Sequence, residues 1–106
     1  MGKSLNPNRT DVLEGPGAVQ AVVTVGTSAS EIKVGASRIP NRQALMVYND
    51  GNATIFYSPS ASVTISGATK GFPLYKDQFF ILPVGDQPWY WICGSSNTSV
   101  IVAEVP

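Results

Sequence analysis

Histidine is absent from this 106-residue sequence, and cysteine occurs only once, at Cys93. The chain therefore lacks both the commonest general base and the commonest metal ligand. One cysteine without histidine can form neither an internal disulfide nor a zinc site. Cys93 follows the apolar residues 89–92 and has no histidine to activate it. We interpret it as a small buried hydrophobe rather than a nucleophile.

Charged residues are also scarce, at 13% of the chain, about half the usual quarter. Seven basic residues balance seven acidic ones, so the formal net charge is zero. Nucleic-acid binding depends largely on clustered Lys and Arg. The basic residues here are scattered, which argues against nucleic acid and against an anionic membrane: Lys3, Arg9, Lys33, Arg38, Arg42, Lys70 and Lys76. A net charge of zero gives little colloidal repulsion and favours self-association.

Long hydrophobic runs are missing as well, so no segment is long enough to span a bilayer as a helix. The first eleven residues are polar and do not resemble a signal peptide. We therefore expect synthesis in the cytoplasm, without a secretory step.

The acidic residues offer little for catalysis. They are Asp11, Glu14, Glu31, Asp50, Asp77, Asp86 and Glu104. A paired-carboxylate hydrolase is a distant alternative, because three of the seven lie at predicted turns, where Asp bonds the local backbone. The oxygens of residues 49–52 could suit calcium, but Asp50-Gly51 is better explained as a hairpin turn. We predict no catalytic, cofactor-binding or metal-binding residue, and a protein that is not an enzyme.

The remaining sequence has the period-two alternation of β-strands. Val19, Ala21, Val23 and Val25 fall on one face, Val63 and Ile65 are expected inward, and residues 78–82 read as a strand buried on both faces. Ten glycines and eight prolines divide the chain into strand-length pieces. The strands are expected at residues 18–25, 31–34, 43–48, 53–58, 62–66, 78–82, 89–93 and 99–105. This spacing indicates an all-β fold, either a sandwich, a jelly roll or a small barrel. Of these we expect a small β-sandwich that is jelly-roll-like.

Residues 1–17 differ from the rest because Pro and Gly interrupt them. We expect an extended N-terminal arm here and a β-sandwich domain over residues 18–106. In one interpretation the arm pairs with a neighbouring subunit and is anchored by Val12 and Leu13. A loose tail is the alternative.

The aromatic residues Trp89, Tyr90 and Trp91 admit two interpretations. Either they fill the core or a subunit interface, which is our preference, or they form a platform that stacks on sugar rings. All three, together with Val12 and Leu13, are candidate partner contacts.

From about Arg42 to Glu104 the chain resembles small β-sandwich virion proteins of tailed bacteriophages. The likeness rests on the order of residues 44–49 with a glycine turn, residues 53–57, Val63-Thr64, Gly71-Phe72-Pro73-Leu74, Asp77, residues 89–92 and residues 100–104. The Gly-Phe-Pro-Leu element is its most specific part.

This resemblance implies an accessory structural protein of the virion, with no catalysis and no cofactor. The leading hypothesis is a head decoration (cement) protein that binds the major capsid protein, or another virion protein, and stabilises the capsid lattice. Its location would be the virion after synthesis in the host cytoplasm. A homo-oligomer, for example a trimer on a local symmetry axis, fits the low charge. The alternative is a tail or fibre module that binds a host receptor or carbohydrate.

Overall fold

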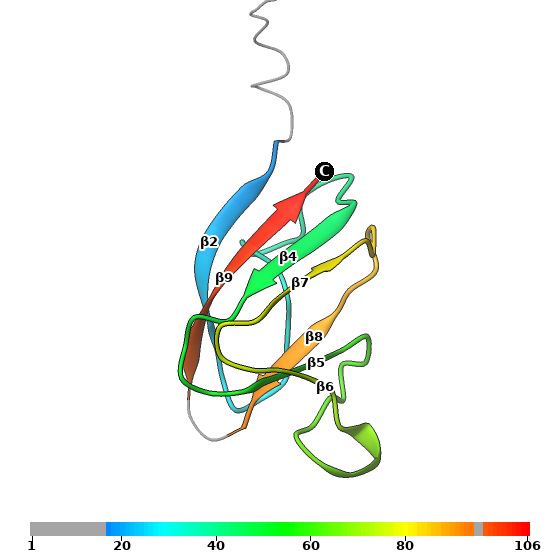
Figure 1. Ribbon diagram of the computed structural model, residues 1–106. Coiled ribbons are helices and arrows are strands. Elements are labelled where there is room, and N and C mark those ends of the chain that lie inside the picture. The colour runs from blue at the N-terminus through cyan, green and yellow to red at the C-terminus, as the bar shows by residue number, and fades with distance from the viewer. Residues whose placement is uncertain (1–16, 95–96) are drawn as a thin grey trace, which may run out of the picture.

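The chain forms two antiparallel β-sheets that pack face to face in a β-sandwich-like arrangement (Figure 1). The computed structural model describes residues 17–94 and 97–106. The predicted contacts Val12 and Leu13, and with them nearly all of the predicted arm, lie outside the described residues.

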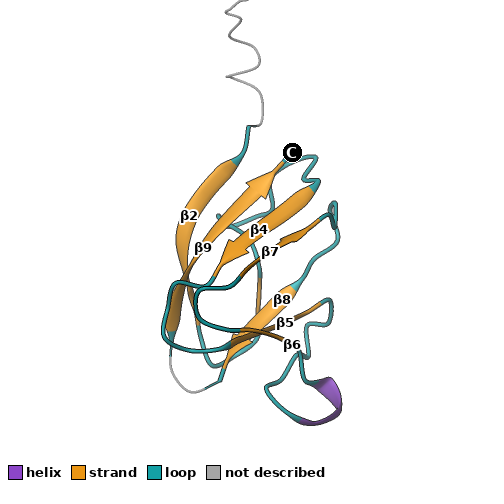
Figure 2. Cartoon of the chain, in the orientation of Figure 1, coloured by secondary structure: helices purple, strands orange, loops and turns teal. Residues whose placement is uncertain are grey.

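Each sheet has four strands within the described residues. The first sheet has the order β2 (Val19–Val25), β9 (Thr98–Val105), β4 (Ala44–Tyr48) and β7 (Phe79–Leu82). The second has the order β3 (Ser30–Glu31), β8 (Tyr90–Cys93), β5 (Ile55–Ser58) and β6 (Phe72–Leu74). Within the described ranges the single helical turn is the 3₁₀ segment η1 (Gly67–Thr69), which Figure 2 shows in the connection from β5 to β6.

The predicted alternation places one face of each strand in the interior. In β9, Thr98, Val100, Val102 and Glu104 are buried, and the residues between them are not. The buried side chains of both sheets meet in one core, where Trp91 is the largest fully buried residue. Its other buried members are Val25, Ile32, Leu45, Val47, Ile55, Leu74, Cys93, Val100 and Val102.

The hairpin predicted at residues 49–52 is wrong. β4 pairs with β9 and β7, whereas β5 pairs with β8 and β6, so the segment between them crosses from one sheet to the other. Gly51 does not have the positive φ that a type I′ turn requires. The buried side chain of Asn49 holds this crossover: its amide nitrogen donates to the carbonyls of Ala53 and Leu74, and its oxygen accepts from the Gly51 N–H.

Three other strand predictions need correction. The strand expected at residues 31–34 is only the two-residue β3, Ser30–Glu31. Residues 62–66 contribute only an isolated bridge between Thr64 and Lys70, and Ile65 points to solvent while Val63 is buried. Residues 78–82 are not buried on both faces. β7 is an edge strand of the first sheet, and only one of its faces meets the core, so Phe79 and Ile81 remain exposed.

Candidate functional site

The reactive side chains are dispersed in the described part of the chain. No three residues of the types His, Cys, Asp and Glu come together there. Glu104 forms a buried ion pair with Arg42, and Glu31 forms ion pairs with Lys33 and Arg38. These ion pairs give Glu31 and Glu104 a structural role. No helix among the described residues is long and apolar enough to cross a membrane.

A different feature stands out, which is the face of the first sheet that points away from the core. Its side chains are those that alternate with the buried ones, and four large apolar residues are exposed on it. Val22 is 70% exposed, Phe79 65%, Ile81 54% and Met46 41%. We call this surface, formed by residues 20, 22, 44, 46, 48, 79, 81, 101 and 103, the outer apolar face.

The strand register aligns this face into two continuous rows. In one row Val22 lies opposite Ile101, Ile101 opposite Tyr48, and Tyr48 opposite Phe79. In the other, Gln20 lies opposite Ala103, Ala103 opposite Met46, and Met46 opposite Ile81. Side chains that are directly opposite have Cβ atoms about 4.5–5.5 Å apart, so each row is in contact across the whole sheet.

A shallow groove of about 170 Å³ runs over this face. Its walls include Gln20, Met46, Tyr48, Phe79, Ile101 and Ala103. None of the residues that form the outer apolar face carries a formal charge. A surface of this kind suits an uncharged, apolar protein surface, because a charged partner would lose its hydration without gaining a counter-charge.

One ionisable group borders the face. The Tyr48 hydroxyl donates a hydrogen bond to Asp77 Oδ1 at 3.1 Å. The Asp77 carboxylate, through this bond and through its negative charge, raises the pKa of Tyr48 above its ordinary value of 10.0. Tyr48 therefore stays neutral over the whole physiological range, and the face stays uncharged.

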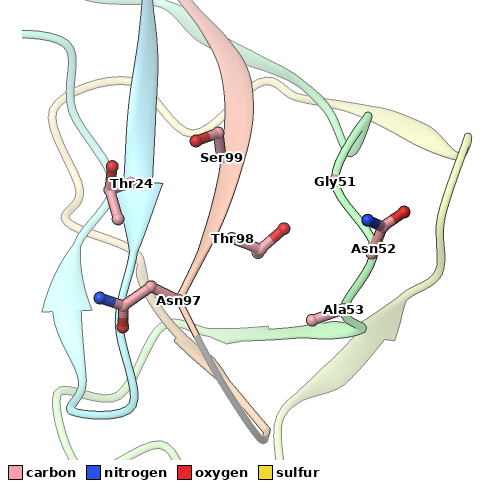
Figure 3. Close-up of a pocket in the computed structure, with 7 residues that line it drawn as sticks. All are labelled: Thr24, Gly51, Asn52, Ala53, Asn97, Thr98 and Ser99. Carbon is pink, nitrogen blue, oxygen red and sulfur yellow. The ribbon is translucent and has the colours of Figure 1, made fainter.

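A second cavity, of about 540 Å³, adjoins the outer face at the start of β9 (Figure 3). Its lining has no charged and no aromatic side chain. Thr24, Asn52, Asn97, Thr98 and Ser99 supply hydroxyl and amide groups, and Gly51 and Ala53 complete it. Gly51 has a steric role here, because a Cβ at this position would lie 1.7 Å from Thr98 Oγ1. Such a lining can bind neutral polar groups by hydrogen bonds.

The three predicted aromatic contacts do not form one exposed surface. Trp91 is only 1% exposed and belongs to the core, so it cannot reach a partner while the domain is folded. Trp89 is half-buried against the core, with its ring centroid 6.1 Å from that of Tyr57. Tyr90 is half-buried in β8, between Ser58 and Glu31 on the neighbouring strands. A sugar platform made of Trp89 and Trp91 is therefore wrong.

Sequence reasoning did not identify the outer apolar face, although a signal existed. Residues 44–48, 79–82 and 100–103 are apolar at consecutive positions, not only at alternate ones. Such runs are typical of strands that are covered on both sides. In the described structure only one side is covered, so the other side is a surface without a partner.

No protein-family model, no curated protein and no solved structure matches this chain.

Proposed function

We propose that this chain is a non-enzymatic structural protein of a virion, most specifically a head decoration protein that docks onto the capsid lattice. The observation that carries the proposal is the outer apolar face, where Val22, Met46, Phe79 and Ile81 are exposed together. Contiguous apolar patches on soluble proteins mark interaction sites. The partner is a protein surface that is itself apolar and uncharged, on the major capsid protein or another virion protein.

The magnitude of this burial bears on how the protein would bind. Covering the exposed parts of those four side chains is worth about 5 kcal/mol in total. Association costs about 4–15 kcal/mol in lost freedom of motion. One face of one copy is therefore marginal, and firm attachment requires several linked contacts. A homo-oligomer, or an additional contact from the N-terminal arm through Val12 and Leu13, would supply them.

The strand order supports a jelly-roll fold, the finer form of the fold we propose. When the eight described strands are numbered along the chain, the first sheet has the order 1-8-3-6 and the second has the order 2-7-4-5. Eight strands in two Greek keys define a jelly roll, an architecture that recurs in viral capsid and lectin domains. Architecture alone does not establish function, so the exposed face remains the main support.

The test is binding of the purified full chain to particles of its virus from which it has been removed. Phe79→Ser and Ile81→Ser should each weaken binding by at least about tenfold, because each removes buried apolar area. Tyr75→Ser is the matched control: Tyr75 is 54% exposed but lies outside the outer apolar face. A full chain carrying Val12→Asp and Leu13→Asp tests the arm separately.

Three results would contradict the proposal. The protein could be missing from purified particles, it could be found on the tail and not on the head, or the Phe79 and Ile81 variants could bind as tightly as the Tyr75 control. The second result would favour the alternative of a tail or fibre module.

The polar cavity is a specific observation that favours the alternative of a tail or fibre module. Its hydroxyl and amide lining fits a neutral, polyhydroxylated ligand such as a glycan on a host surface. Titration with neutral oligosaccharides, followed by amide chemical shifts, should then perturb Thr24, Asn52 and residues 97–99. Asn97→Ala should abolish these shifts. Perturbation elsewhere, or none, would exclude this cavity as a sugar site.

A further inference from the structure

Among residues 17–94 and 97–106, the first sheet ends in a long strand whose outer edge has no partner strand. β2 is the terminal strand of that sheet, with β9 as its neighbour on one side (Figure 1). Among the described residues, no hydrogen bond outside the β2–β9 ladder involves Val19–Val25. An edge of this kind presents a row of backbone donors and acceptors to solvent.

β2 also lacks the features by which proteins usually prevent edge pairing, which are short length, charge and proline. It has seven residues, Val-Gln-Ala-Val-Val-Thr-Val, and none of them is charged or is proline. The other three edge strands are shorter, and two of them carry a charge or a proline. β3 has two residues and carries the ion-paired Glu31, β6 has three and contains Pro73, and β7 has four. The contrast indicates that the β2 edge is kept open for a partner strand.

The sequence of β2 identifies that strand as a second β2. If two copies run antiparallel about a twofold axis at Val22, then Val22 faces the partner's Val22 and Ala21 faces the partner's Val23. In the same register Gln20 faces the partner's Thr24, and Val19 faces the partner's Val25. All seven residues are paired, polar with polar and apolar with apolar. A shift by one residue would place Gln20 opposite a valine and would exchange the two faces of the strand.

We propose that two copies of this chain associate through their β2 edges, antiparallel and centred on Val22, so that their first sheets join into one eight-stranded sheet. A twofold interface requires a surface that is complementary to itself, and an uncharged strand with palindromic polarity meets that condition. The zero formal net charge leaves no long-range repulsion between copies.

The pairing also gives Val22 a neighbour. Val22 is 70% exposed, more than any other large apolar residue in the described structure. Next to the partner's Val22, it joins the two Val22–Ile101–Tyr48–Phe79 rows into one apolar band that crosses both copies. The proposed dimer has twofold symmetry and is not a trimer. Its formation does not depend on what the outer apolar face binds.

Cysteine cross-linking tests the register on the full chain. Residues directly opposite in an antiparallel pair have Cα atoms about 4.5–5.5 Å apart, within disulfide range. Val22→Cys should therefore form an intermolecular disulfide under mild oxidation. Thr24→Cys alone should not, because two copies of residue 24 would lie roughly 13 Å apart. A mixture of Gln20→Cys and Thr24→Cys chains should cross-link, and the wild type should not, because Cys93 is buried.

Light scattering supplies the second measurement. The wild-type mass should rise from monomer to dimer with concentration, and Val22→Lys should weaken this association at least about tenfold by placing two like charges opposite each other. Met46→Lys puts the same charge on the same face in β4, far from the edge, and should leave the dimer intact. Circular dichroism should show both variants folded, since both positions are solvent-exposed.

A wild type that is monomeric at all concentrations, or an oligomer whose mass Val22→Lys does not change, would overturn the proposal. So would cross-linking of Thr24→Cys alone as efficiently as Val22→Cys. Docking and pairing can fail independently, because the Phe79 and Ile81 variants change the outer apolar face on β7, three strands away from the β2 edge, whereas cross-linking reports only which residues of two β2 strands lie opposite each other.

Discussion

Arg42 and Glu104 form an ion pair in which both side chains are fully buried, with Arg42 Nη1 at 3.0 Å from Glu104 Oε2. The arginine also donates to three backbone carbonyls, those of Gly85, Gln87 and Ile32. The second carboxylate oxygen accepts the Val34 N–H at 3.1 Å. The pair therefore joins β9 to two irregular segments, residues 32–43 and 83–89, which would otherwise have unsatisfied backbone groups inside the protein.

Removing the arginine should be strongly destabilising. Arg42→Met leaves Glu104 buried without a counter-charge, and we expect a loss of about 3–5 kcal/mol in the free energy of unfolding. Urea denaturation of the variant and the wild type measures it. A loss under about 1 kcal/mol would mean that water reaches Glu104 in solution.

The double variant Arg42→Met with Glu104→Leu distinguishes the contribution of the ion pair from that of the hydrogen bonds between these two side chains and the backbone. Replacing an isolated buried ion pair by apolar residues is often neutral or stabilising. Here three carbonyls and the Val34 N–H would lose their partners, so we still expect a loss of at least about 2 kcal/mol. A double variant as stable as the wild type would show that these backbone bonds contribute nothing net.

Gly51 should not tolerate a side chain. A Cβ at this position would lie 1.7 Å from Thr98 Oγ1 and 2.9 Å from the Ser99 carbonyl oxygen. Gly51→Ala should lower stability by about 1–3 kcal/mol in thermal or chemical unfolding. Adding Thr98→Ala should recover only part of this loss, because the Ser99 carbonyl remains. Gly35→Ala is the control, since its nearest neighbour would be 4.0 Å away; equal effects of the two alanine variants would refute the steric argument.

Asp77 should control the titration of Tyr48. Because the hydrogen bond and charge of Asp77 raise the folded-state pKa of Tyr48 above 10.0, folding favours the neutral phenol. The resulting contribution to stability is complete below pH 10.0 and disappears as the pH rises through the folded-state pKa. In Asp77→Asn, phenolate absorbance should develop at lower pH than in the wild type. Comparison with Tyr48→Phe shows which part of the absorbance change comes from Tyr48. Identical titration curves for the wild type and Asp77→Asn would contradict the role of Asp77 in raising the pKa of Tyr48.

Tryptophan fluorescence should distinguish the two indoles. In Trp89→Phe the remaining Trp91, which is 1% exposed, should emit at short wavelength and resist quenching by iodide. Denaturant should shift the emission to longer wavelength and make it accessible. Strong quenching of the folded variant would place Trp91 at the surface and would reopen the sugar-platform interpretation.

The alternation of residues predicted most strands to within a residue or two, because a side chain's face in a strand depends only on local geometry. β2, β8 and β9 are examples. The crossover at Asn49 could not be predicted in the same way. Asp50-Gly51 favours a tight turn locally, but the amide of Asn49 bonds Leu74, which is 25 residues away. This long-range hydrogen bond stabilises the crossover between the two sheets in place of the tight turn.

The sequence by itself determined that the chain builds strands, that it has no histidine to contribute to catalysis or metal binding, and that it is electrically neutral, because these properties follow from residue type and spacing. Only the tertiary structure decided which strands pair, that Arg42 and Glu104 meet across 62 residues, and that one apolar sheet face and one strand edge remain uncovered in the described chain. The physical reason is that a period of two assigns each side chain to a face of its strand, while what covers that face depends on contacts between distant segments.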